Sequence, residues 1–176
     1  MLDVIEKICF SEEEIQDIVK KLADDITKDY MGKDPLIFGL LNGCLPFMSD
    51  LVKKIDTELT LAYVKASSYD GAVSTGNVKF EGKMPDVKGR DVIIADDILD
   101  TGRTLKSVRD MLLEMGAKSV ECCVLLDKPS GRKVDIKPKY CGGVVPNAFV
   151  VGYGLDYNEH YRNLPYIGVL KKEIYS

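Results

Sequence analysis

The most informative part of this chain is residues 92–105, Val92-Ile93-Ile94-Ala95-Asp96-Asp97-Ile98-Leu99-Asp100-Thr101-Gly102-Arg103-Thr104-Leu105. It begins with four apolar residues typical of a buried strand, continues into acidic residues, and passes through a Thr-Gly-Arg-Thr loop into a helical pattern. Free backbone N–H groups and two hydroxyls at a helix start favour a bound phosphate, and the helix dipole adds to this attraction. Gly102 allows the backbone to come close to such a ligand. The stretch therefore predicts a strand–loop–helix phosphate site.

Three carboxylates beside the expected phosphate site restrict the ligand. Asp96, Asp97 and Asp100 would repel a bare polyphosphate, so we expect them to face hydroxyl groups, a protonatable base or a divalent cation. Asp96 and Asp97 suit the vicinal hydroxyls of a ribose, which donate charge-assisted hydrogen bonds to carboxylates. Asp100 lies nearest the loop, where it is placed to exchange a proton with a bound base.

Other interpretations of the same residues are weaker. Each acid alone would also fit a strand end or a helix cap, but the whole arrangement favours a site. Asp100-Thr101-Gly102 is also the tripeptide of aspartic proteases, which need paired aspartates in a mostly β fold. An apolar run that ends in two acids resembles a Walker B strand, but the chain contains no GxxxxGKS or GxxxxGKT loop.

Strand and helix patterns alternate along the chain, which predicts an α/β fold with a mainly parallel sheet flanked by helices. Ser11 and Glu14 form a capping-box signature before a helix that we expect to reach about Tyr30, and Gly116 is expected to end a later helix in the left-handed conformation. The other expected elements are strands at 36–41, 59–67, 92–95, 120–126, 149–151 and 166–169, and helices at about 47–55 and 105–115. Such sheets bind ligands beyond the carboxyl ends of their strands, where the acids fall.

The segment from about Ser67 to Gly82 is rich in glycine and serine, and we expect it to be a lid, because long loops in compact domains are usually functional. The 176 residues contain no repeat, low-complexity tract or obvious linker, so we expect one domain over residues 1–176.

Composition narrows the class of protein. The net charge of −4 argues against broad nucleic-acid binding, which needs a basic surface. No apolar run approaches the roughly 18 residues of a membrane span, so we expect no membrane partner. The five cysteines show no metal-type spacing and are interpreted as reduced core thiols of a cytoplasmic protein: Cys9, Cys44, Cys122, Cys123 and Cys141.

Residues 92–105 resemble the phosphoribosyl-diphosphate signature of type I phosphoribosyltransferases, and the chain from about Leu36 to Leu170 is similar to hypoxanthine-guanine phosphoribosyltransferases. The resemblance implies the type I phosphoribosyltransferase fold, with a small hood from the N- and C-terminal segments and a mobile lid loop at about 67–82. It also implies a purine-salvage enzyme that uses Mg²⁺, takes phosphoribosyl diphosphate and a 6-oxopurine as substrates, and forms a homodimer or homotetramer.

The resemblance implies a role for each matching position of this sequence. On the donor side these are Leu41, Asn42, Gly43 and Arg162 at the diphosphate, Asp96 and Asp97 at the ribose, Thr101, Gly102, Arg103 and Thr104 at the 5′-phosphate, and Ser68 and Tyr69 in the lid. On the base side these are Asp100 as the acid-base residue at purine nitrogen 7, Lys128 at the 6-oxo group, Phe149 as the stacking ring, and Ile98 and Val150 as further contacts. Asp96, Asp97 and Asp156 match positions associated with magnesium.

Asn42 departs from the family pattern, because some relatives have lysine at this position. The main-chain role of the loop at 41–43 is kept, whereas a side-chain charge near the diphosphate is lost. The pattern also implies a cis peptide bond between Leu41 and Asn42.

Lys128 gives a chemical reason to expect hypoxanthine or guanine rather than adenine. A lysine ammonium only donates hydrogen bonds, so a 6-amino group would place donor against donor, and such a mismatch discriminates strongly. The order of hypoxanthine, guanine and xanthine stays open. The alternative from another class is a regulatory protein that keeps the pocket as a sensor and binds nucleic acid, which the acidic balance and the presence of Asp100 and Lys128 disfavour.

Overall fold

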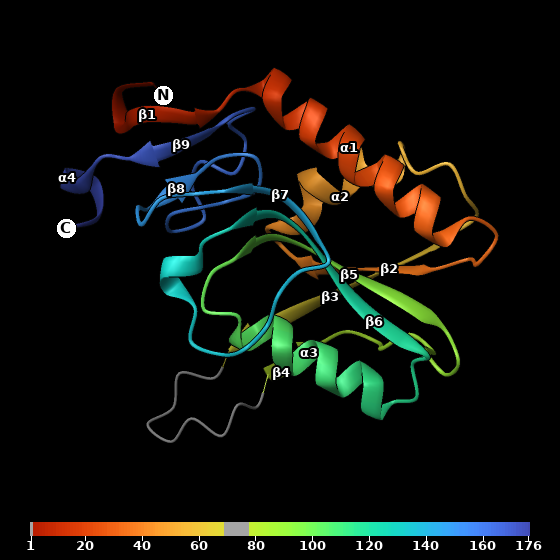
Figure 1. The fold of residues 1–176 in the computed structure, drawn as a ribbon. Coiled ribbons are helices and arrows are strands. Elements are labelled where there is room, and N and C mark those ends of the chain that lie inside the picture. Colours follow the sequence, from red (N-terminus) through yellow and green to blue (C-terminus); the bar gives the residue numbers. More distant parts are fainter. Residues whose placement is uncertain (1, 69–77) are drawn as a thin grey trace.

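A six-stranded sheet forms the centre of the computed structural model, which describes residues 2–68 and 78–176 (Figure 1). The strand order is β4-β3-β2-β5-β6-β7, and all neighbours are parallel except β4, which runs antiparallel to β3. The strands are β2 (Leu36–Leu41), β3 (Thr60–Ser68), β4 (Val78–Glu81), β5 (Asp91–Leu99), β6 (Ser119–Asp127) and β7 (Tyr140–Val144). The prediction of a mainly parallel sheet is confirmed.

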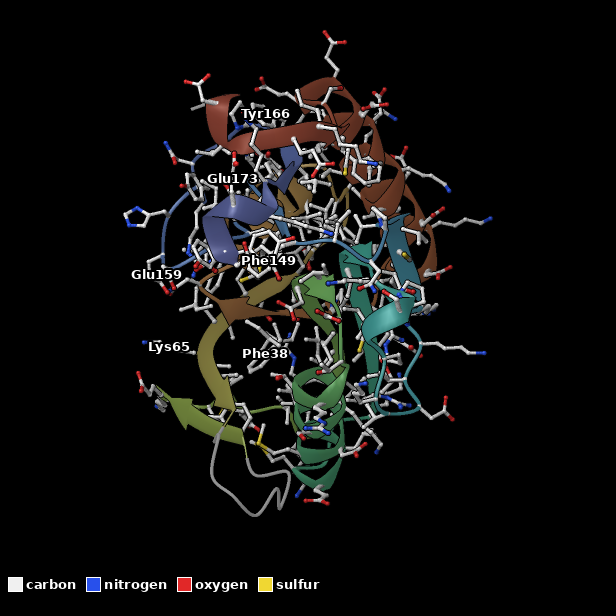
Figure 2. All side chains as sticks on the ribbon, turned by 90° about the vertical axis from the view of Figure 1, so that its left-hand side faces the viewer. Phe38, Lys65, Phe149, Glu159, Tyr166 and Glu173 are labelled. Carbon is white, nitrogen blue, oxygen red and sulfur yellow. The ribbon has the colours of Figure 1, made fainter. Side chains whose placement is uncertain are left out.

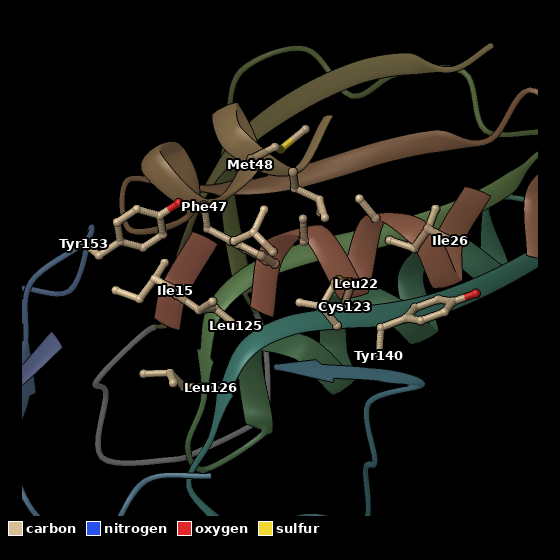
Figure 3. Packing of buried hydrophobic residues seen from close by; sticks show 14 of the residues in the cluster. Ile15, Leu22, Ile26, Phe47, Met48, Cys123, Leu125, Leu126, Tyr140 and Tyr153 are labelled. Atoms are coloured by element: carbon tan, nitrogen blue, oxygen red, sulfur yellow. The ribbon is translucent and has the colours of Figure 1, made fainter. Parts of the chain in front are cut away.

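Helices cover both faces of this sheet (Figure 1): α1 (Glu12–Tyr30) and α2 (Cys44–Val52) lie on one face, and α3 (Arg103–Glu114) lies on the other. Because side chains alternate along a strand, Ile93 of β5 packs in the cluster with α1 and α2, whereas Ile94 packs with α3. Figure 3 shows the first cluster, whose labelled members include Ile15, Leu22, Ile26, Phe47, Met48, Cys123 and Leu125.

The predicted helix ends are confirmed at two positions. The backbone N–H of Ser11 donates to the Glu14 carboxylate at 2.8 Å, and the N–H of Glu14 donates to the Ser11 hydroxyl at 3.2 Å, so the capping box starts α1. After α3, Gly116 adopts a φ of 93°, and its N–H donates to the carbonyl oxygen of Leu113 at 3.0 Å.

The N- and C-terminal parts of the chain meet in a second, smaller sheet, called the hood below (Figure 1). Its order is β1-β9-β8, all antiparallel, formed by β1 (Ile5–Phe10), β9 (Ile167–Leu170) and β8 (Val150–Val151). Two short segments adjoin it, the 3-10 turn η1 (Leu2–Val4) and α4 (Lys172–Tyr175). β8 and β9 match the two predicted C-terminal strands, but they pair in the hood instead of extending the parallel sheet.

β5 is longer than its sequence pattern predicts, because it runs to Leu99 instead of ending at Ala95. Asp96 and Ile98 continue the register with β6, so the backbone of the acidic pair is held in a strand. The two acids are therefore fixed more firmly than residues of a loop would be.

β4 lies inside the segment from Ser67 to Gly82 that the sequence pattern assigns to a loop. It pairs antiparallel with β3, where Phe80 faces Ala66. The prediction of a loop is therefore wrong for 78–81, where the structure has a strand, and residues 69–77 of the expected lid lie outside the described residues. The sequence pattern also does not predict β1 or β7.

The five free cysteines differ in exposure. Cys44, Cys122 and Cys123 are buried, but Cys9 is half-buried and Cys141 is exposed, so the expectation of five core thiols is wrong for these two. Cys141 lies on β7, the last strand of the six-stranded sheet, whose side chains do not all face the core. No helix in the described part of the chain has the length and apolar character needed to cross a membrane.

Candidate active site

Two cavities open at the carboxyl end of β5, and they share part of their walls. The larger, of about 320 Å³, includes the following predicted site residues: Leu41, Gly43, Asp96, Asp97, Ile98, Asp100, Thr101, Gly102, Thr104, Asp156 and Arg162. The smaller, of about 240 Å³, includes Asp97, Ile98, Asp100, Lys128, Phe149, Val150 and Asp156. The shared residues are Asp97, Ile98, Asp100 and Asp156, so ligands in the two cavities would meet at the end of β5.

The loop between β5 and α3 forms one end of the larger cavity. Gly102 precedes α3 with a φ of 80°, a left-handed conformation that favours glycine. An added Cβ at Gly102 would also lie 2.6 Å from a methyl carbon of Ile136, so the loop packs tightly on the segment behind it. The first N–H groups of an α-helix have no intrahelical acceptor. At the start of α3 the N–H of Arg103 donates to the Thr101 hydroxyl at 3.4 Å, and Thr101, Gly102 and Thr104 line the cavity.

Asp96 and Asp97 are oriented by the backbone that follows them. The N–H of Asp97 donates to a carboxylate oxygen of Asp96 at 3.1 Å, and the N–H of Ile98 donates to Asp97 at 2.7 Å. A Cβ at Gly43 would lie 1.9 Å from the Asp97 carboxylate, so glycine is required for the loop after β2 to approach this acid.

Burial raises the pKa of both acids, and at Asp96 the neighbouring Asp97 carboxylate raises the pKa further. Burial raises the pKa of Asp97 to about 6, although the hydrogen bond from Ile98 and the charge of Arg162 act in the opposite direction. Two adjacent charges of the same sign therefore lie in a site that disfavours both, and a ligand that donates hydrogen bonds would stabilise them.

Asp97→Asn should raise thermal stability at neutral pH. A carboxyl group with a raised pKa in the folded state keeps its proton after the unfolded chain has lost its own, so stability falls as pH rises through that interval. The variant lacks this penalty, so its gain in melting temperature should appear between about pH 4, near the usual pKa of Asp, and pH 6, near the raised pKa of Asp97.

Melting curves of both proteins from pH 4 to pH 8 provide the check. Asp25→Asn, on the exposed face of α1, is the matched control and should change the melting temperature little at any pH. A gain for Asp97→Asn that is the same at pH 4 and pH 8 would contradict the electrostatic cause.

Lys128 and Asp100 form an ion pair at the smaller cavity, with 3.6 Å between the lysine Nζ and a carboxylate oxygen. The Lys128 side chain is only 16% exposed, so its ammonium has few partners other than Asp100 and a bound ligand. A hydrogen-bond donor and an acceptor thus lie side by side in the cavity wall.

Arg162 connects the C-terminal segment to the larger cavity. Its guanidinium pairs with Asp156 at 3.0 Å and donates to the carbonyl oxygen of Gly154 at 2.6 Å. It also pairs with Glu159 at 3.1 Å, the simple ion pair that sequence spacing suggests, but the segment is not helical. A Cβ at Gly154 would lie 2.1 Å from the carbonyl oxygen of Gly43, so this segment packs directly on the loop after β2.

Phe149 lies between the hood and the six-stranded sheet (Figure 2). The residue is 37% exposed, and its ring stacks on Tyr175 with centroids 5.2 Å apart and meets Tyr157 edge to face at 5.5 Å. Neither tyrosine lines the smaller cavity, whereas Phe149 does, so part of the ring stays free for a ligand.

Some predicted residues are not brought into the cavities. Asn42 and Arg103 line neither of the two, and the Arg103 side chain is exposed at the start of α3. Ser68 ends β3, and Tyr69 lies outside the described residues. The peptide bond between Leu41 and Asn42 is cis, as predicted.

The structure also adds lining residues that the sequence does not identify, namely Leu40, Ala66, Leu99, Leu105, Ala148 and Leu155. Behind Asp100, the 3-10 turn η2 (Pro129–Gly131) comes so close that a Cβ at Gly131 would lie 1.5 Å from the carboxylate. The turn signal Pro129-Ser130-Gly131 is visible in the sequence, but its contact with a residue about thirty positions earlier is not.

Sequence and fold are both similar to those of phosphoribosyltransferases. The family model described as phosphoribosyl transferase domain matches residues 11–158. The hypoxanthine-guanine phosphoribosyltransferase of Streptococcus pneumoniae (strain ATCC BAA-255 / R6) is 51% identical over 175 residues, covering 98% of this chain and 97% of the relative. The enzyme of that name from Lactococcus lactis is 52% identical over 174 residues, covering 98% and 94%.

The similarity to solved structures indicates the same family as the sequence similarity. The crystal structure of a hypoxanthine phosphoribosyltransferase from Staphylococcus aureus matches with a TM-score of 0.95 at 48% identity, covering 99% of this chain and 96% of that chain. Full-length similarity at this level, together with the phosphate-type loop after β5, leaves one assignment. The chain belongs to the phosphoribosyltransferase family, in its hypoxanthine-guanine phosphoribosyltransferase branch.

Proposed function

We propose that the protein transfers the 5-phosphoribosyl group of phosphoribosyl diphosphate to nitrogen 9 of hypoxanthine or guanine, giving IMP or GMP and diphosphate in purine salvage. The proposal rests on one observation. A cavity lined by the start of α3, of the kind that binds phosphate, adjoins a cavity lined by Lys128, Asp100 and Phe149. The two substrates would meet at Asp97, Ile98, Asp100 and Asp156, which line both.

The donor fits the larger cavity. The amides and hydroxyls of Thr101–Thr104 suit the 5′-phosphate, and Asp96 with Asp97 suits the two ribose hydroxyls, whose hydrogen bonds would relieve the unfavourable burial of the acids. The diphosphate would then lie toward Leu41–Gly43 and Arg162. Because the Arg103 side chain is exposed, its contribution in this proposal is limited to its backbone N–H, which would exchange its long 3.4 Å hydrogen bond to the Thr101 hydroxyl for one to the phosphate.

The base fits the smaller cavity between Phe149 and Ile98, with Val150 beside it. A 6-oxopurine presents its oxygen next to nitrogen 7, and the ammonium of Lys128 and the carboxylate of Asp100 match these two atoms as donor and acceptor. Asp100 would take the proton of nitrogen 7 while nitrogen 9 forms its bond to the anomeric carbon. The bond from that carbon to the diphosphate oxygen breaks, and its electron pair leaves with the diphosphate.

Mg²⁺ in this proposal binds mainly through oxygens of phosphoribosyl diphosphate. No three acidic, histidine or cysteine side chains converge on a metal position within the described ranges, as a site built by protein alone would require. One or two carboxylates with substrate phosphates and water are usual for Mg²⁺, so Asp96 and Asp97 fit, whereas Asp156 is already paired with Arg162. When bound, the ion offsets charge on the departing diphosphate.

Three further expectations belong to this proposal. The expected lid, which includes Ser68 and Tyr69, would exclude water from the activated ribose. Five free cysteines fit a reducing compartment such as the cytoplasm. A homodimer or homotetramer is supported by exposed apolar side chains on α2 and β3, namely Leu45, Leu61 and Tyr63.

A panel of bases tests the proposed function. With phosphoribosyl diphosphate and Mg²⁺, hypoxanthine or guanine should give nucleotide, and adenine should react at least about 10²-fold more slowly because its 6-amino group faces the Lys128 ammonium. Lys128→Met should remove most of this preference by lowering kcat/KM for hypoxanthine about 10²-fold. Xanthine belongs in the panel because the sequence leaves its rank open.

The rate of nucleotide formation is followed for each base by chromatography. Lys133→Met, in the same segment, is the matched control and should keep the preference, since Lys133 lines neither cavity. Faster turnover of adenine than of hypoxanthine would reject the role of Lys128.

A further inference from the structure

Arg132 lies behind the site and holds the backbone at the end of β5. Its Nε donates to the carbonyl oxygen of Asp100 at 3.0 Å, one Nη donates to that of Leu99 at 3.3 Å, and the other donates to that of Ile136 at 2.6 Å. The guanidinium also pairs with Asp127 at the end of β6, and both side chains are less than one-fifth exposed, at 19% and 18%. Only arginine offers donors in several fixed directions from one group.

The segment that carries Arg132 wraps around the loop after β5. The N–H of Lys128 donates to the carbonyl oxygen of Leu99 at 3.0 Å, and the N–H of Lys133 donates to that of Thr101 at 2.9 Å. Gly131 lies against the Asp100 carboxylate, and an added Cβ at Gly102 would lie 3.1 Å from Cδ of Arg132. The two segments thus behave as one packed unit, with Arg132 at its centre.

Lys128 and Asp100 belong to the two halves of this unit. Lys128 begins the wrapping segment and Asp100 belongs to the loop that is wrapped, so the distance between their side chains depends on how the halves are joined. Two contacts of Arg132, to the carbonyl oxygens of Leu99 and Asp100, join the halves, and its contacts to Asp127 and Ile136 fix the guanidinium on the side of the wrapping segment. Arg132 lines neither cavity and therefore does not meet the substrates itself.

We propose that Arg132 is a positioning residue that sets the spacing of Lys128 and Asp100, and thereby the preference for 6-oxopurines. The inference rests on the proposed function, in which these two side chains bind adjacent atoms of the base. A shift of about 1 Å at a reacting group can reduce a rate 10²-fold. Loss of the hydrogen bonds from Arg132 to Leu99 and Asp100 would therefore change both the rate and the preference between bases.

Arg132→Lys keeps the positive charge beside Asp127 but loses the planar guanidinium, whose N–H groups donate to three carbonyl oxygens. We expect kcat/KM for hypoxanthine to fall about 10- to 100-fold, and the ratio of kcat/KM for hypoxanthine over adenine to fall about tenfold or more. A purely structural role would lower both activities alike, through the amount of folded enzyme, and would leave the ratio unchanged.

Arg90→Lys is the matched control. Arg90 also joins segments through its guanidinium, which donates to the carbonyl oxygen of Asp34 at 3.1 Å and to the Thr60 hydroxyl at 2.6 Å. It lies at the amino end of β5, at the opposite end of the strand from the site. The variant should keep the wild-type ratio of the two bases even if its melting temperature falls. Both kcat and KM for each base, and the melting temperature, are measured for all proteins.

An unchanged base ratio in folded Arg132→Lys would overturn the inference. If that variant does not fold, Asp127→Asn decides, because it removes the charge that holds the guanidinium while keeping the shape of the side chain: a fall in the ratio supports the inference, and no change overturns it. Failure of the proposed function itself is separate, because it would appear as absent transfer to hypoxanthine by the wild-type enzyme.

Discussion

Asp100→Asn is expected to lower kcat by about 10²- to 10⁴-fold and to leave the binding of phosphoribosyl diphosphate nearly unchanged. The substitution keeps the size of the side chain but removes the base that takes a proton from purine nitrogen 7. The donor is held by other groups of the larger cavity, namely Thr101, Thr104, Asp96 and Asp97, which the change does not touch.

Steady-state kinetics with hypoxanthine and titration calorimetry with the magnesium salt of the donor separate the two effects. Asp110→Asn, whose acid pairs with Lys106 on α3, is the control and should leave kcat unchanged. A fall of less than about threefold in kcat for Asp100→Asn would remove Asp100 from the acid-base role.

Gly131→Ala is expected to lower kcat by about 10²-fold while costing little stability. The new Cβ would lie 1.5 Å from a carboxylate oxygen of Asp100 and 2.8 Å from its Cγ, so the carboxylate has to turn away from the base. The φ of Gly131 is not in the left-handed region, so the backbone accepts alanine, and the displaced group is the end of a flexible side chain.

Gly89→Ala gives the opposite pattern and serves as the control. Gly89 has a φ of 71° with no atom within 4 Å of an added Cβ, so alanine there should cost about 1 kcal/mol of stability and leave kcat unchanged. Thermal melting and kinetics of both variants provide the comparison. Wild-type kcat in Gly131→Ala would show that the Asp100 carboxylate does not need its observed position.

The residue pattern by itself predicts the part of the site that lies in one continuous stretch, whereas Lys128, Phe149 and Arg162 are expected only from the resemblance to phosphoribosyltransferases. Residues 92–105 combine a strand pattern, acids and a loop at a helix start, and each depends on neighbours only a few positions away. The capping box of Ser11 and Glu14 is predictable for the same reason, since both its hydrogen bonds join residues three positions apart.

The parts that the sequence does not predict depend on contacts between distant segments. β1 pairs with β9 across most of the chain, so its strand character comes from that partner and not from a local pattern. The sequence around Arg132 gives no sign of its hydrogen bonds, because the acceptors, the carbonyl oxygens of Leu99 and Asp100, belong to a distant segment. Cys141 is assigned to the core by its residue type, but its side of β7 faces solvent.

A crystal structure of the enzyme with IMP would test directly whether the loop after β5 binds the 5′-phosphate. We expect the phosphate to accept hydrogen bonds from the amides of residues 101–104, the ribose hydroxyls to donate to Asp96 and Asp97, and the 6-oxo group to accept from Lys128. A phosphate bound elsewhere, with these loop amides engaged by protein groups, would contradict the assignment of the loop after β5 as the phosphoribosyl site.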